Sequence, residues 1–96
     1  MNQQDEIVIN NQLEHDFFFI ELPPNNVDDG IWKNRNGEFI FMEEMGLDYL
    51  KSCIHTCKNA ISRLKESARR KIVKDTLIPL AEKKLEELES EFDKKT

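Results

Sequence analysis

Residues 47–68 of the chain read LDYLKSCIHTCKNAISRLKESA, and the fold prediction starts from this segment. Its apolar side chains recur at alternating steps of three and four residues. This 3.5-residue repeat is typical of a helix that buries one continuous stripe. We call the stripe the heptad seam, and it consists of Leu47, Leu50, Ile54, Cys57, Ile61, Leu64 and Ala68.

The repeat predicts a helix over residues 47–74, which would be roughly 35 to 40 Å long. A small sheet cannot cover that length, so part of the seam must pack elsewhere. We expect it to contact a second helix folded back as an antiparallel hairpin, and also the same helices of another copy in a homo-oligomer resembling a coiled coil. The predicted oligomer interface consists of Leu50, Ile54, Cys57, Ile61 and Leu64.

A second helix is predicted over residues 76–94. Thr76 as N-cap would place Pro79 in the first turn, where its missing N–H is harmless; alternatively, Pro79 kinks a longer helix. The side chains expected to face inward are Leu77, Leu80, Ala81, Leu85, Leu88 and Phe92.

Upstream of the seam, residues 7–46 are predicted to form an antiparallel meander of three or four short strands, after a frayed terminus at 1–6. The runs IVI at 7–9 and HDFFFIEL at 15–22 are interpreted as strands, because both are apolar and short. A strand through the three phenylalanines at 17–19 would turn at least one ring outward, which also favours a partner chain.

The β-hairpin prediction rests on the dipeptide Asn36-Gly37, which separates two extended runs at 31–34 and 38–42. Asn-Gly favours the type I′ turn, because both central residues of that turn have positive φ. Trp32 and Tyr49, the only tryptophan and tyrosine, are interpreted as anchors of the core or its edge. The whole chain is therefore predicted to be one α+β domain, 1–96.

Composition limits the function classes. The chain has 96 residues and a net charge of −5, which argues against nucleic acid as a partner. No segment approaches the ~18 apolar residues of a membrane span, and the first residues lack the pattern of a signal peptide. We therefore expect a cytoplasmic protein with no membrane partner and with reduced cysteines.

Two motifs suggest chemistry. Cys53-Ile-His55-Thr-Cys57 contains zinc-type ligands, but His55 would lie about 200° around the helix from the cysteines, so packing cysteines are favoured and no metal or cofactor is predicted. Neither His15 nor His55 lies in a known catalytic spacing, so no catalytic residue is predicted and the protein is not expected to be an enzyme.

Basic residues concentrate toward the end of the first predicted helix. One interpretation is that they stabilise the helix C-terminus through its dipole. The other is an anion-binding or partner-binding site, completed if a neighbouring copy contributes its hairpin. The candidate residues are Lys33, Arg35, Arg63, Arg69, Arg70 and Lys71.

Residues 32–54, WKNRNGEFIFMEEMGLDYLKSCI, resemble a pattern in small uncharacterised proteins of tailed bacteriophages. The pattern is a Trp, a basic turn with Gly, an alternating apolar strand, an acidic-Met pair and a helix that opens with an aromatic or His before Leu. Tyr49 stands where that group commonly has His. The resemblance implies a phage accessory protein located in the host cytoplasm, and it supplies no activity or ligand.

Together these observations predict non-catalytic binding that counters a host defence. The protein would either sequester an anionic, nucleotide-like signal or occupy the surface of a host protein. The alternatives are a structural or assembly oligomer, or a zinc-binding protein that uses Cys53 and Cys57.

Overall fold

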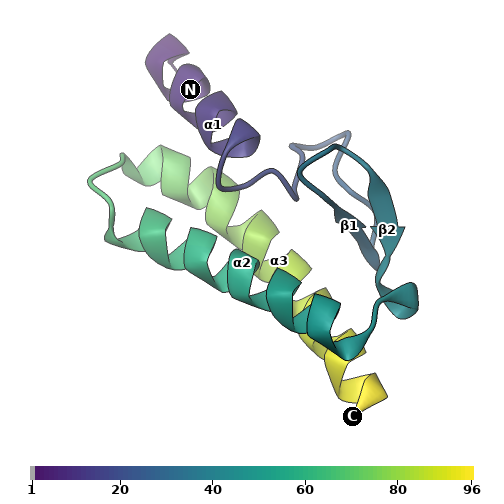
Figure 1. Ribbon diagram of the computed structural model, residues 1–96. Coiled ribbons are helices and arrows are strands. Elements are labelled where there is room, and N and C mark those ends of the chain that lie inside the picture. Colours follow the sequence, from purple (N-terminus) through teal and green to yellow (C-terminus); the bar gives the residue numbers. More distant parts are fainter. Residues whose placement is uncertain (1) are drawn as a thin grey trace.

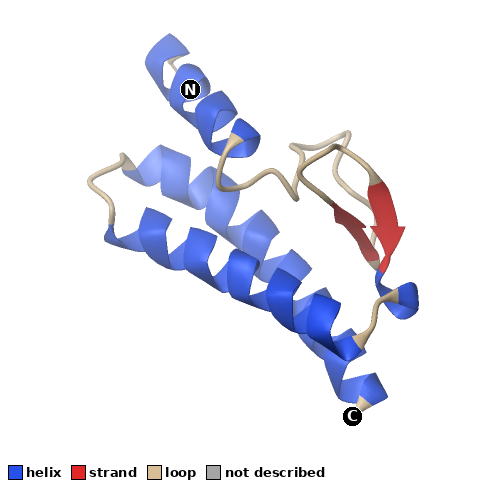
Figure 2. Ribbon diagram, viewed as in Figure 1, coloured by secondary structure: helices blue, strands red, loops and turns tan. Residues whose placement is uncertain are grey.

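Two long antiparallel helices, α2 (Leu47–Glu66) and α3 (Lys71–Lys95), form the largest part of this computed structural model, which describes residues 2–96. The ion pairs Lys58–Glu89 (3.6 Å) and Lys65–Glu82 (3.5 Å) show the antiparallel direction, because a step forward along α2 matches an equal step back along α3. The remaining elements are α1 (Gln3–Glu14), β1 (Ile31–Lys33), β2 (Phe39–Phe41) and the 3-10 turn η1 (Met42–Glu44). Figures 1 and 2 show this α+β arrangement.

The core lies mainly between α2 and α3. Cys57, at the centre of the heptad seam, is fully buried, and its Sγ donates a hydrogen bond to the carbonyl of Ala81 over 3.3 Å. All six side chains of the second helix that were expected to face inward belong to this core or pack against it. No helix within residues 2–96 is both long enough and apolar enough to cross a bilayer.

The predicted oligomer interface needs correction. Four of its residues are buried inside a single chain, and Ile54 is half-buried against the same core. Because α3 packs against the middle of the seam within the same chain, these side chains do not form a surface that another copy can contact; Leu47 and Ala68, at the two ends of the seam, are exposed. The four buried residues are Leu50, Cys57, Ile61 and Leu64.

Of the predicted helix boundaries, 47–74 and 76–94, the start at residue 47 is confirmed, whereas the end at 74 and the start at 76 are wrong. The chain leaves α2 after Glu66, where the hydroxyl of Ser67 donates to the carbonyl of Leu64 over 2.7 Å. The ammonium of Lys74 reaches back to the carbonyls of Lys65 (3.0 Å) and Ser67 (2.8 Å). These groups satisfy carbonyls that the helix end leaves without an internal donor. At least Lys74 of the basic stretch therefore stabilises a helix C-terminus.

Pro79 lies within α3, which begins at Lys71, so the helix does not start near Thr76. The hydroxyl of Thr76 donates to the carbonyl of Ile72 (2.7 Å) and has no capping role. Pro79 is exposed. It costs α3 the hydrogen bond that an N–H at this position would donate to the carbonyl of Asp75, and its ring crowds the same carbonyl. Packing of the surrounding apolar positions against α2 outweighs this loss.

The N-terminal strand predictions, at 7–9 and 15–22, are wrong, and the sheet has two strands rather than three or four. The run at 7–9 lies in α1, whose first turn is capped by Asn2: its Oδ1 accepts from the N–H of Asp5 over 2.8 Å. Residues 15–19 form a turn, and this allows all three phenylalanines at 17–19 to face inward. The argument that one ring must face a partner therefore no longer holds.

The β-hairpin is confirmed, with β1 and β2 paired antiparallel and Trp32 opposite Ile40. Its turn differs from the predicted type I′, because Gly37 alone has positive φ (+80°). The carbonyl of Asn34 accepts from the N–H of Gly37 (3.0 Å), and its side-chain Oδ1 accepts from the N–H groups of Asn36 and Glu38. The Asn34 side chain thus organises a three-residue loop that ends in a left-handed glycine.

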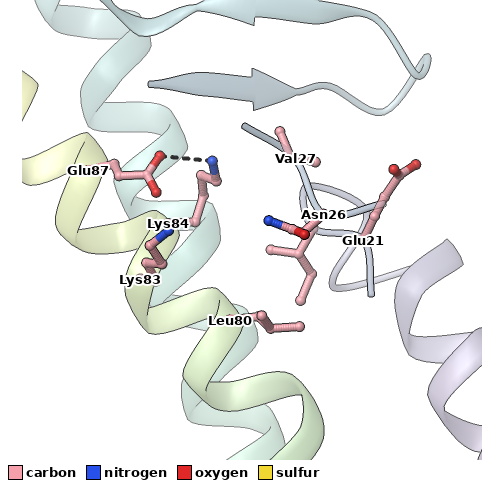
Figure 3. A pocket seen from close by; sticks show the side chains of 8 residues that line it. Glu21, Asn26, Val27, Leu80, Lys83, Lys84 and Glu87 are labelled. Carbon is pink, nitrogen blue, oxygen red and sulfur yellow. Dashed lines mark hydrogen bonds and ion pairs between the residues drawn. The ribbon is translucent and has the colours of Figure 1, made fainter. Parts of the chain in front are cut away.

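A buried ammonium attaches the loop before β1 to α3. Lys84 donates to the carbonyls of Asp28 and Ile31, each over 3.0 Å, and Glu87 accepts from the N–H of Gly30 over 2.9 Å. Figure 3 shows Lys84 and Glu87 pointing at each other beside a small cavity. The cavity has about 30 Å³ of space, enough for a water molecule or two and too small for a ligand.

Candidate functional site

A groove lies between the β-hairpin and the first half of α2, and its volume is about 260 Å³. The hairpin contributes one wall, α2 the other, and the turn after α1 contributes one ring. We refer to it below as the hairpin groove. It is lined by Phe18, Trp32, Asn34, Arg35, Asn36, Tyr49, Ser52, Cys53 and Thr56.

Aromatic rings give the groove a rigid base. Trp32 is 3% exposed and stacks on Phe19, with ring centroids 5.0 Å apart and an interplanar angle of 8°. Phe18 meets Trp32 edge to face at 5.9 Å. Each ring is held by another ring of the set, so the wall is preformed by packing.

The indole N–H of Trp32 takes part in none of the hydrogen bonds found within residues 2–96. Every fully buried side-chain nitrogen or oxygen of a non-exposed residue in that part of the chain has a partner, so the indole N–H must retain some contact with solvent. Trp32 lines the hairpin groove, and we infer that its N–H is accessible to solvent there. Most polar groups that are nearly buried have a hydrogen-bond partner, so this N–H is a donor that a ligand in the groove could use.

Arg35 is the cation of the groove. Its guanidinium carbon lies 4.4 Å from the ring centroid of Phe18, a cation–π distance, and no carboxylate of residues 2–96 pairs with it. Most of the other predicted anion-binding residues are neutralised instead. Their ion pairs are Lys33–Glu21 (2.7 Å), Arg63–Asp16 (3.4 Å), Arg70–Asp5 (3.5 Å) and Lys71–Asp75 (3.5 Å).

Three hydroxyl groups extend along the α2 wall, at Tyr49, Ser52 and Thr56. Steps of three and four residues place them on one helix face. None of the three hydroxyls hydrogen-bonds to another side chain in the described chain. Burial raises the pKa of Tyr49, with smaller contributions from Cys53 and Glu38, so its hydroxyl keeps its proton at neutral pH. The groove therefore combines aromatic faces, one cation and several uncommitted donors.

The cysteines do not form a metal centre in this structure. No group of three or more His, Cys, Asp or Glu that could hold a metal occurs in the described part of the chain. Burial raises the pKa of both thiols to about 12, which opposes the thiolate form that zinc requires. His55 is exposed, and its Nε2 lies 3.0 Å from the amide nitrogen of Asn59.

Of the six predicted anion-binding residues, only Arg35 lies in the hairpin groove. Lys33 is on the opposite face of β1. The others lie near the end of α2 (Arg63), in the loop to α3 (Arg69 and Arg70) and at the first residue of α3 (Lys71), away from the β-hairpin (Figure 1). Sequence reasoning missed Phe18, Ser52 and Thr56 as parts of a site. The spacing of the hydroxyls at 49, 52 and 56 was a usable signal, whereas the position of Phe18 depends on the tertiary fold.

No protein-family model matches the chain, and no curated protein or solved structure is significantly similar to it.

Proposed function

We propose that the protein acts by non-catalytic binding of a small ligand that carries one planar ring and one anionic group, and that a nucleoside monophosphate is the best-fitting class. The proposal rests on one observation: Arg35 and the indole N–H of Trp32 lie in the same groove. Neither group has a polar partner in residues 2–96, although the protein carries 19 acidic side chains.

Arg35 suits the anionic end of such a ligand. A guanidinium offers parallel N–H donors that match two phosphate oxygens, and its stacking on Phe18 restricts its orientation. The hydroxyls of Ser52 and Thr56 add neutral donors on the opposite wall. A phosphate between the walls would satisfy groups that otherwise have only water.

The ring of the ligand would stack on Tyr49, which is 42% exposed, near the buried edge of Trp32. Stacking of a base on an aromatic side chain contributes about 1–3 kcal/mol and tolerates different bases. Most small-molecule sites have volumes of about 300–1,000 Å³. The groove, at about 260 Å³, lies just below this range, so it limits the ligand to roughly the size of a mononucleotide and excludes an oligonucleotide.

The lining supports binding rather than acid–base chemistry. None of its nine residues is a carboxylate or an imidazole. The thiol of Cys53 keeps its proton, because burial raises its pKa to about 12. These features leave the groove with donors and aromatic faces but without a group poised to exchange a proton near neutral pH.

The biological setting in this proposal comes from the sequence resemblance. Seven of the nine lining residues fall within residues 32–54, the segment that resembles phage accessory proteins. We therefore propose a phage-type accessory protein of the host cytoplasm that sequesters a nucleotide-like host signal. The competing hypothesis for this non-catalytic role is that the protein binds the surface of a host protein.

Isothermal titration calorimetry tests the proposal. The ligands are 5′-AMP, 5′-GMP, 3′,5′-cyclic AMP, adenosine and inorganic phosphate. We expect at least one nucleotide to bind more tightly than adenosine or phosphate, and Arg35→Gln to weaken it about tenfold or more. Arg69→Gln is the matched control, since Arg69 is also exposed and has no carboxylate partner in the described chain, but lies outside the groove.

Two results would refute the proposal: no nucleotide binds at millimolar concentration, or Arg35→Gln and Arg69→Gln weaken binding equally. The second result would indicate diffuse electrostatic attraction rather than a site.

A further inference from the structure

The open edge of β2 carries exposed aromatic side chains. Phe39 is 60% exposed and Phe41 is 53% exposed, and both lie on the sheet face opposite Trp32. Large apolar side chains at an edge strand are a common site of chain association. Ile40, between them, faces the other way and packs against the core.

The main chain of the same two residues is also unpaired. The N–H of Asn34 donates to the carbonyl of Glu38 (2.9 Å), and the N–H of Met42 donates to the carbonyl of Gly30 (2.9 Å). Hydrogen-bonded pairs alternate in an antiparallel ladder, so Ile40 also bonds to β1 while Phe39 and Phe41 direct their N–H and carbonyl groups outward. No group in residues 2–96 contacts these outward groups through a hydrogen bond.

The chain closes part of its other sheet edge, at Ile31, whereas the outward N–H and carbonyl of Lys33 have no hydrogen-bond partner within residues 2–96. On β1, the N–H of Ile31 donates to the carbonyl of Asp28 (3.3 Å), and the carbonyl of Ile31 accepts from the buried ammonium of Lys84 (3.0 Å). Because the loop and Lys84 occupy the β1 edge at Ile31, β2 is the more accessible strand for extending this two-stranded sheet.

We propose that β2 pairs antiparallel with β2 of a second copy, about a two-fold axis that passes beside Ile40. In this register Phe39 stands opposite Phe41 of the second copy, and Phe41 opposite its Phe39. Within each pair, the N–H of each residue donates a hydrogen bond to the carbonyl of the other. The edge is thus self-complementary, as a two-fold contact requires, and the product is a four-stranded sheet with four phenylalanines on one face. This goes beyond the proposed function and uses none of the residues that line the groove.

The size of the contact predicts a transient dimer. Four phenylalanines, each about half exposed before association, would bury roughly 400 Å², whereas stable interfaces bury about 1,200 Å² or more. Glu38 and Glu43 flank the strand and bring like charges near the ends of the contact, which weakens it further. The dimer should therefore form only at high protein concentration.

Sedimentation equilibrium of the full chain, up to about 1 mM, tests the proposal. We expect a monomer–dimer equilibrium that Phe41→Lys weakens about tenfold or more and that Phe39→Pro abolishes. Proline at 39 removes an outward N–H and no ladder bond to β1, so the hairpin itself should persist. Ile72→Lys is the matched control, because Ile72 is 38% exposed on α3, away from β2.

Amide hydrogen exchange of the wild-type chain keeps the test decisive if Phe39→Pro does not fold. The amides of Phe39 and Phe41 should exchange more slowly as protein concentration rises, whereas the amide of Lys33, on β1, should not change. A chain that stays monomeric at the highest concentration overturns the proposal. So does a dimer that Phe41→Lys leaves intact.

Discussion

The ammonium of Lys84 donates to Oε1 of Glu87 over 2.8 Å at a position where the lysine is only 4% exposed. This buried pair links two segments that are more than fifty residues apart, because each partner also bonds to the backbone of the loop before β1. The β-hairpin wall of the groove therefore depends on a side-chain contact with α3.

We expect Lys84→Met to lower the free energy of unfolding by about 2–3 kcal/mol, because it leaves Glu87 charged without its cation and removes two bonds to carbonyls. Urea unfolding measures the change. Lys83→Met is the matched control, since Lys83 pairs with Asp29 over 2.7 Å at the surface and its loss should matter much less. Equal decreases for the two substitutions would show that the burial of Lys84 adds nothing to the free energy of unfolding.

Pro79→Ala should stabilise the protein. Alanine restores the N–H that the carbonyl of Asp75 can accept within α3, and the exposed proline ring gives up little packing. The expected gain in the free energy of unfolding is about 1–3 kcal/mol. Thermal and urea unfolding of the two proteins provide the measurement. A less stable variant would mean that α3 needs the proline at this position.

Gly37→Ala should destabilise the protein by about 1 kcal/mol, because alanine rarely adopts the φ of +80° that the hairpin turn requires. Gly37→Asn is the matched control, since asparagine adopts a positive φ more readily than alanine does, and a Cβ at Gly37 would meet open space. Equal urea midpoints for the two variants would rule out backbone conformation as the cause.

Stability should fall at alkaline pH because of the buried thiols. Burial raises the pKa of Cys57 from 9.0 to about 12, so above pH 9 the unfolded chain loses a proton that the folded chain retains. The free energy of unfolding then decreases by at most about 1.4 kcal/mol per pH unit for this thiol. Urea unfolding at pH 8 and pH 10 should show a smaller decrease for Cys57→Ala than for wild type. Identical decreases would mean that Cys57 titrates normally in the fold.

The β-hairpin and the α2–α3 core could be predicted because their signals are local. Asn36-Gly37 strongly favours a turn through its local conformational preference, and the middle of the heptad seam, from Leu50 to Leu64, identifies the buried face of α2. What the seam could not specify was its partner. The same stripe fits a second copy or another helix of the chain. In the structure the chain turns after Glu66, and α3 runs back along α2 and becomes the partner of the seam.

The N-terminal region was mispredicted because β-branched and aromatic residues were taken as strand signals. Ile7, Val8 and Ile9 lie in a helix with weak amphipathic character. The better sequence signal was Asn2, a good N-cap residue, followed by the acidic residues Asp5 and Glu6 in what became the first turn. The groove was predictable only in part. Arg35 is a turn residue that could be identified as a cation, whereas Phe18 reaches the groove through long-range packing.

The indole N–H of Trp32 gives the most direct test of ligand binding at the groove. The chain has one tryptophan, so a ¹H–¹⁵N correlation spectrum contains a single indole signal. Titration with 5′-AMP or 5′-GMP should shift this signal saturably in the wild-type and Arg69→Gln proteins, with a much weaker response in Arg35→Gln. An indole signal that stays unchanged at millimolar nucleotide in the folded wild-type protein would contradict the account.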